Sequence, residues 1–271
     1  MIGTSCSAAI NSTLRPWTLR ANAYAHLVLI LLLAASATAL ATGLGAVPVF
    51  WLGGRASAWQ PALYGLAAGA MTVASIVGLL KPGFDEGPTG AVLAGVATGV
   101  LFLGVTRVAL THSEVEFGGR TGPGARLSVL VFLVLLVHSL PEGFSIGTAY
   151  ASDVSGLSLF VILAIGLQNV PEGTSIAVPM AEAGYTRSQM FWAAVLTSAP
   201  QPVGAAIAYF LVHTFKHLLP YSFGFAAGAM LALVASDLAP RALRRGGPAR
   251  GLVGTLAGAG VMLGLSAALG V

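Results

Sequence analysis

Long apolar runs separated by a few polar residues dominate the sequence. A helix needs about 20 apolar residues to cross a bilayer. Eight runs reach this length, at positions 24–52, 59–80, 88–110, 127–150, 156–180, 187–212, 217–240 and 250–270. Because the connections are short, the pattern predicts an all-α membrane protein. Residues 24–271 form one eight-helix transmembrane domain, and residues 1–23 form an extramembrane segment.

Composition supports a chain embedded in the lipid bilayer. Hydrophobic residues make up 56% of the chain and charged residues only 8%, whereas a soluble domain carries roughly a quarter charged residues. The sequence has no basic patch with interleaved aromatic residues, so it gives no support for a nucleic-acid-binding protein. Cys6 is the only cysteine, which excludes a disulfide framework or a cysteine-rich metal site.

Basic residues are distributed unequally between the two sets of loops. One side holds Arg55, Arg107, Arg120, Arg126, Arg187, Arg241, Arg244, Arg245 and Arg250. The other side holds Arg15, Arg20, Lys81 and Lys216. The positive-inside rule then places both termini outside a cell (inner or plasma) membrane. Residues 15–41 resemble a signal peptide, but the apolar run continues to position 52, which favours an uncleaved first helix over cleavage.

Two segments indicate an internal repeat. Residues 64–71 (Tyr-Gly-Leu-Ala-Ala-Gly-Ala-Met) match residues 223–230 (Phe-Gly-Phe-Ala-Ala-Gly-Ala-Met) at six of eight positions. These segments lie on the second and seventh helices, which run in opposite directions. The sequence thus predicts an inverted repeat, helices 1–3 against 6–8, around a central pair of helices 4 and 5. Secondary transporters commonly have this architecture, with the substrate site near the midplane; convergence of Gly-Ala packing faces is the alternative.

The central pair carries matching Pro-Glu-Gly motifs, in residues 138–143 and 168–173. His138 and Glu142 are one turn apart on one helix face, and Gln168 and Glu172 repeat this spacing on the next helix. Ionisable groups inside the bilayer are costly and are functional by default. Imidazole and carboxylate ligands suit Zn²⁺, and also Fe²⁺, Mn²⁺, Co²⁺ or Cd²⁺. Met71 adds a soft thioether ligand or fills a packing gap.

Other polar residues allow more than one interpretation. Asp237 is a gate, part of a second site, or the partner of Arg241, and the ion pair is favoured. His213 and His217 are a ligand pair near an outer loop, or solvated loop residues. The same two readings, a metal-receiving or a solvated loop, apply to His112, Glu114 and Glu116.

The paired motifs, together with eight helices and residues 42–48 (Thr-Gly-Leu-Gly-Ala-Val-Pro), resemble the ZIP (Zrt/Irt-like protein) family of metal transporters over the whole chain, particularly its bacterial GufA-like branch. The resemblance implies import of divalent metal ions into the cytoplasm by an elevator-like, alternating-access motion. It implies a first metal site formed by Met71, His138, Glu142, Gln168 and Glu172. It implies a second site at Ser139, Asn169 and Gln201, bridged by the two glutamates.

The chain departs from the ZIP pattern around the second site. The family usually has Asn at the position of Ser139, often Glu in the helix-six motif that here contains Gln201, and commonly Glu at the position of Arg241. This loss of acidic charge predicts one well-formed metal site, with the second absent or weak.

Two other functions and one partner remain open. A His with two acids can hold catalytic Zn²⁺, so an intramembrane zinc-dependent hydrolase is an alternative to a non-enzymatic transporter. The altered second site also fits a non-transporting metal-binding or sensing relative. No ATP-binding motif occurs. The face formed by Gly90, Gly95, Gly99 and Gly104 would suit a homodimer or internal packing.

Overall fold

Helices account for nearly all of the computed structural model, which describes residues 3–111, 123–244 and 247–271. The first half contains α1 (Gly3–Ala46), α2 (Val49–Leu52), η1 (Gly53–Trp59), α3 (Gln60–Ser75), η2 (Ile76–Leu80), α4 (Lys81–Glu86) and α5 (Thr89–Thr111). The central pair is α6 (Pro123–Ala151) and α7 (Leu157–Glu182). The last part contains α8 (Arg187–Thr197), α9 (Pro200–Thr214), η3 (Lys216–Leu218), α10 (Leu219–Leu233), η4 (Val234–Leu238), α11 (Ala239–Ala242) and α12 (Pro248–Leu269).

Eight helical segments in the described residues are long and apolar enough to cross a membrane, which confirms the predicted number. They are Ala25–Leu52, Arg55–Glu86, Thr89–Ala109, Leu127–Ala151, Leu157–Glu182, Arg187–Thr214, Lys216–Ala242 and Pro248–Leu269. The fold is therefore that of a multi-pass, all-α membrane protein. The division at position 23 stays a prediction, and the loop residues His112, Glu114 and Glu116 lie outside the described residues.

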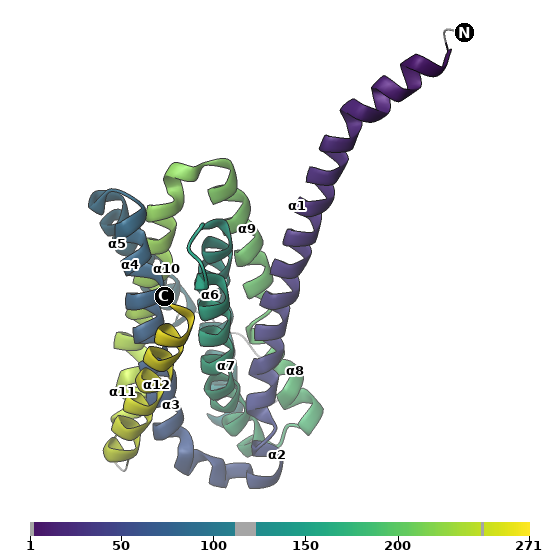
Figure 1. The fold of residues 1–271 in the computed structure, drawn as a ribbon. Coiled ribbons are helices and arrows are strands. Elements are labelled where there is room, and N and C mark those ends of the chain that lie inside the picture. The colour runs from purple at the N-terminus through teal and green to yellow at the C-terminus, as the bar shows by residue number, and fades with distance from the viewer. Residues whose placement is uncertain (1–2, 112–122, 245–246) are drawn as a thin grey trace.

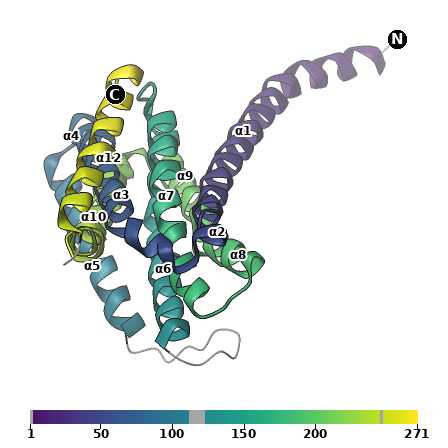
Figure 2. The same cartoon turned by 90° about the horizontal axis from the view of Figure 1, so that it is seen from below.

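The bundle has a central pair of helices flanked by two groups (Figures 1 and 2). Helices α6 and α7 lie in the middle and pack on each other. On one side α7 packs against α1, and α6 packs against α9. On the other side α3 pairs with α12, and α10 pairs with α5. The N-terminal part of α1 extends beyond the bundle (Figure 1). The site between α6 and α7 is thus enclosed by helices from both repeats.

Close glycine contacts occur at matching positions of the two repeat motifs. A Cβ atom added at Gly65 of α3 would lie 2.0 Å from the carbonyl oxygen of Gly251 on α12. At Gly224, the equivalent residue of the second repeat, it would lie 2.1 Å from the carbonyl oxygen of Val92 on α5. Both helix pairs therefore touch backbone to backbone at matching positions. Two π-helical segments, η2 and η4, also follow the two repeat motifs at nearly matching places.

The glycine face of the third span packs inside the molecule. Added Cβ atoms at Gly95 and Gly99 would lie 2.2 and 2.1 Å from carbonyl oxygens of α10. Nothing lies within 4 Å of the equivalent atoms at Gly90 and Gly104. Internal packing therefore accounts for the two middle glycines of this face, and a homodimer stays a prediction.

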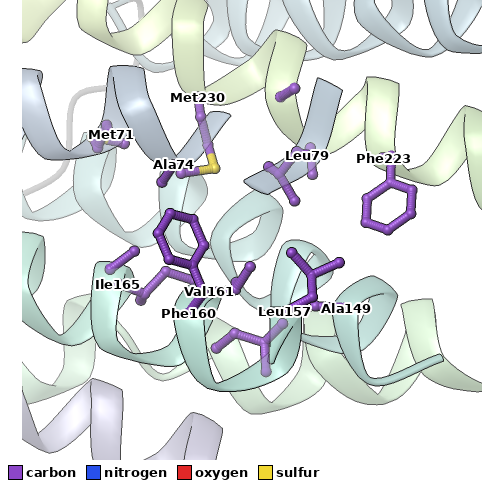
Figure 3. Packing of buried hydrophobic residues seen from close by; sticks show 14 of the residues in the cluster. Met71, Ala74, Leu79, Ala149, Leu157, Phe160, Val161, Ile165, Phe223 and Met230 are labelled. Carbon is purple, nitrogen blue, oxygen red and sulfur yellow. The ribbon is translucent and has the colours of Figure 1, made fainter. Parts of the chain in front are cut away.

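An apolar cluster fills the space between α7 and the pair α3 and α10. Phe160 and Ile165 of α7 lie opposite Met71 of α3 and Met230 of α10 (Figure 3). All four side chains are fully or almost fully buried. This cluster seals one side of the central pair with residues from both repeats.

Candidate metal site

Three ionisable side chains converge between the central helices. His138 and Glu142 come from α6, and Glu172 comes from α7. One ligand atom from each lies within 4.8 Å of the other two, and this is the only such group of His, Cys, Asp and Glu side chains in the described residues. His138 and Glu142 are 0% exposed, and Glu172 is 2% exposed. The predicted convergence of the two motifs is therefore present in the structure.

The residues beside the glutamates allow this close approach. Pro141 and Pro171 lie inside α6 and α7, where each removes a backbone donor. An added Cβ at Gly143 would lie 2.0 Å from a backbone oxygen of α9, and one at Gly173 would lie 1.7 Å from the carbonyl oxygen of Thr42 on α1. Only a residue without a side chain fits after each glutamate.

Glu142 is held by neighbouring donors. Gln168 Nε2 donates to Glu142 Oε1, and Gln201 Nε2 donates to Glu142 Oε2 over 2.8 Å. His138 Nε2 lies 3.4 Å from Glu142 Oε1 but forms no hydrogen bond with it. Because both carboxylate oxygens are engaged, the orientation of Glu142 is fixed before any ion arrives.

Several other atoms at the site lack a hydrogen-bond partner. Six buried side-chain nitrogen and oxygen atoms have none in the part of the chain that the structure describes, and five belong to residues of the two motifs: both ring nitrogens of His138, Ser139 Oγ, Gln168 Oε1 and Glu172 Oε1. An unsatisfied buried polar group costs roughly 1–3 kcal/mol. Imidazole, amide and carboxylate atoms are electron-pair donors to borderline divalent cations. A bound cation would satisfy one ring nitrogen of His138, Gln168 Oε1 and Glu172 Oε1 together.

A sequence model of the ZIP zinc transporter family matches residues 114–266 of the chain. The chain belongs to the ZIP family. It is 32% identical to the zinc transporter GufA of Myxococcus xanthus, over 85% of this chain and 95% of that protein. It is 35% identical to the zinc transporter ZIPB of Bordetella bronchiseptica, over 85% of this chain and 78% of that protein. A protein of Arabidopsis thaliana assigned as a zinc transporter is 35% identical over 78% of this chain, which spans only 34% of that protein's length. These named relatives are transporters and not enzymes.

Two of the three residues predicted for a second site, Asn169 and Gln201, form a neutral hydrogen-bond network with Thr38, whereas Ser139 Oγ has no hydrogen-bond partner. The side-chain amides of Asn169 and Gln201 donate to each other over 3.3 Å. Asn169 Nδ2 also donates to the backbone oxygen of Thr38 over 2.6 Å, and Thr38 Oγ1 donates to Gln201 Oε1 over 2.8 Å. The network reaches Glu142 through Gln201 but contributes no charge of its own.

The remaining candidates lie in different surroundings. Met71 is fully buried in the apolar cluster, and its role as a ZIP ligand stays a prediction. Asp237 pairs with Arg241 at 2.9 Å, which confirms the favoured interpretation. His213 ends α9 and stacks on an aromatic ring, whereas His217 belongs to η3, so the two do not share one continuous helix.

Two threonines near the site were missed by the sequence analysis. Thr38 binds both amides of the second-site network. Thr42 Oγ1 lies 2.6 Å from Ser198 Oγ. The signal was available, because Thr38 and Thr42 are one turn apart on the same face of an apolar helix.

Proposed function

We propose that this ZIP protein carries Zn²⁺, and also other divalent ions such as Cd²⁺, across the membrane through one site between α6 and α7. The supporting observation is the buried group of His138, Glu142 and Glu172 with its unpartnered acceptor atoms. Two carboxylates would offset the charge of a divalent ion in a region of low dielectric constant. Gln168 Oε1 completes a set of four electron-pair donors.

The burial of the site supports alternating access. His138 and Glu142 lie within the span Leu127–Ala151, and Glu172 lies within the span Leu157–Glu182. An ion bound to fully buried ligands cannot leave without movement of the surrounding helices. Two helix groups flank the central pair, each with helices of both repeats. Relative motion of helix groups around a midplane site is typical of secondary transporters. The arginine-rich end would face the cytoplasm, so both termini would lie outside a cell membrane and the ion would move inward.

The nature of the ligands favours soft and borderline ions. Imidazole nitrogen is a better ligand for Zn²⁺ than for Mg²⁺ or Ca²⁺, which prefer oxygen. The thioether of Met71, if the helix group of α3 approaches the site during transport, would add preference for Cd²⁺ and Zn²⁺.

Purified protein in liposomes should move Zn²⁺ and Cd²⁺ down an imposed gradient, with little or no movement of Mg²⁺ or Ca²⁺. The measurement is the initial rate of uptake seen by a trapped fluorescent indicator, at two pH values. Empty liposomes are the control. Intact, folded protein that moves none of the ions would contradict the transport proposal and favour a metal-binding or sensing role.

We further propose that the site holds a single ion, because the side-chain amide of Gln201 takes the place of a second ion. Gln201 Nε2 donates to Glu142 Oε2, so an amide hydrogen atom lies against the oxygen that would bind a bridged second ion. Asn169 and Thr38 hold Gln201 in this orientation. The hydrogen-bond network of Thr38, Asn169 and Gln201 would thus be a rigid, neutral support for the first site.

Gln201→Glu should raise the zinc stoichiometry from one ion to two per chain. The change replaces a donor by an acceptor and adds a carboxylate beside Glu142, whose charge repulsion a second cation would relieve. Equilibrium dialysis followed by elemental analysis measures the stoichiometry. Gln189→Glu, at the exposed start of α8, is the matched control and should still bind one ion. A wild-type protein that already binds two ions at this site would refute the single-ion proposal.

An intramembrane hydrolase is the second candidate. His138, Glu142 and Glu172 are three ligands of the kind that hold catalytic zinc with one open position. Transport by the named relatives weighs against this function for the present chain. The liposome assay separates the two, because a hydrolase produces no ion flux.

A further inference from the structure

A cavity opens at the arginine-rich end of the central pair. Its volume is about 250 Å³. It lies between η1, α3, the first turns of α6, the end of α7 and the end of the seventh span. The lining includes Tyr64, Leu127, Ser175, Glu182, Arg241 and Arg244. We call this cavity the vestibule.

The vestibule reaches to within one helical turn of the metal site. Ser175 lines it, and Ser175 Oγ donates to the backbone oxygen of Glu172 over 2.7 Å. Arg241, which lines the vestibule, pairs with Asp237 on η4. An ion that left the site toward this end would pass from Glu172 along α7 into the vestibule.

Arg241 stands at this passage in a fixed position. Its Nη2 and Nε atoms lie 2.9 and 3.0 Å from Asp237 Oδ1. Its Nη1 donates to the hydroxyl of Tyr64 over 3.3 Å, and its guanidinium lies 5.4 Å from the centre of the Tyr64 ring. Arg107 Nη2 also lies 3.8 Å from Asp237 Oδ1. These contacts hold a positive charge against the wall of the vestibule.

Two physical effects follow from this arrangement. The guanidinium repels a divalent cation, and the repulsion is stronger here than in bulk water because the side chain is three-quarters buried (24% exposed). At the same time Arg241 pairs with Asp237, a carboxylate beside the vestibule that would otherwise attract the ion. The ion and Arg241 compete for the same acceptor.

We propose that Arg241 and Asp237 form a latch at the vestibule: Asp237 exchanges Arg241 for the transported ion when the ion passes. This inference rests on the transport function proposed above. In this latch Arg241 is a barrier and Asp237 is a transient ligand of the ion. The two residues therefore have opposite effects on the rate of ion transport, although they form one ion pair.

The test compares initial zinc uptake by full-length protein in liposomes. Arg241→Gln removes the barrier and leaves Asp237 with only the longer contact to Arg107, and the rate should rise roughly threefold or more. Asp237→Asn removes the transient ligand and leaves an unpaired cation in the passage, and the rate should fall by a similar factor. Arg244→Gln is the matched control: this residue lines the same vestibule but is exposed, so its effect should be small and should vanish at high ionic strength.

Zinc stoichiometry and melting temperature, measured in detergent for each variant, show whether the site and the fold survive. A fall in rate for both latch variants with normal zinc binding would show that the ion pair is merely structural, and unchanged rates in both would also overturn the latch. In either case a transporting wild type would leave the proposed function intact. Absence of flux in the wild type would instead overturn the proposed function, and the latch with it.

Discussion

Glu172→Ala should abolish zinc binding and zinc transport. Glu172 is the only acidic group that α7 contributes to the buried cluster, and its Oε1 atom is without a hydrogen-bond partner there. No other carboxylate lies in the cluster to replace it except Glu142, which is already fixed by two amides. Loss of an outer-shell partner alone weakens metal binding by about 10–100-fold, so loss of this ligand should exceed about 100-fold. Isothermal titration with Zn²⁺ measures the affinity.

Two further variants make the result specific. Glu172→Gln keeps the volume of the side chain and should lose most of the affinity as well, because it lacks the charge. Glu182→Ala lies on the same helix at an exposed position and should bind zinc like the wild type. Stoichiometric zinc binding by Glu172→Ala, with wild-type affinity, would show that the ion binds elsewhere.

Gly173→Ala should destabilise the protein even without metal. The new Cβ atom would lie 1.7 Å from the carbonyl oxygen of Thr42, and that atom belongs to the backbone of α1. Helices α1 and α7 must therefore separate, which costs about 1–3 kcal/mol or more when a tightly packed contact is overfilled. The melting temperature of the metal-free protein in detergent measures the loss.

Gly166→Ala is the matched control on α7. No atom lies within 4 Å of the Cβ that this change would add. Its melting temperature should be unchanged or slightly higher, because alanine is favoured over glycine in a helix by roughly 0.5–1 kcal/mol. Equal stability of the two variants would mean that α1 and α7 are not in close contact at Gly173.

The eight spans were predictable because the bilayer requires each helix to satisfy its own backbone hydrogen bonds within an apolar run. The pairing of helices was not. The repeat motif of residues 64–71 and 223–230 predicts that two helices are equivalent, but it does not say which helix each one contacts. That choice depends on matching grooves, such as the backbone contact of Gly65 with α12, which involve residues far apart in the chain.

The candidate site also combines features that the sequence predicts with features that it does not. The spacing of His138 with Glu142 predicted a shared helix face, because helical periodicity alone fixes it. An ion pair of Asp237 with Arg241 was favoured because the two residues are close in the sequence, and the structure confirms this pair. The role of Thr38 was not predicted, because its contacts with Asn169 and Gln201 cross between three helices. Residue spacing gives no information on such contacts.

The Arg241–Asp237 pair breaks the symmetry of the two repeats. The matching helix of the first repeat, α4 (Lys81–Glu86), contains no arginine, so the opposite end of the bundle has no such pair on that helix. A barrier at one end of a passive carrier alters kinetics and leaves the equilibrium untouched, since forward and backward crossings must balance there. Liposomes with Arg241→Gln should therefore take up zinc faster than liposomes with the wild type, and those with Asp237→Asn more slowly. All three should reach the same final ratio of zinc inside to zinc outside. A shifted final ratio would mean that the chain couples zinc to a second gradient.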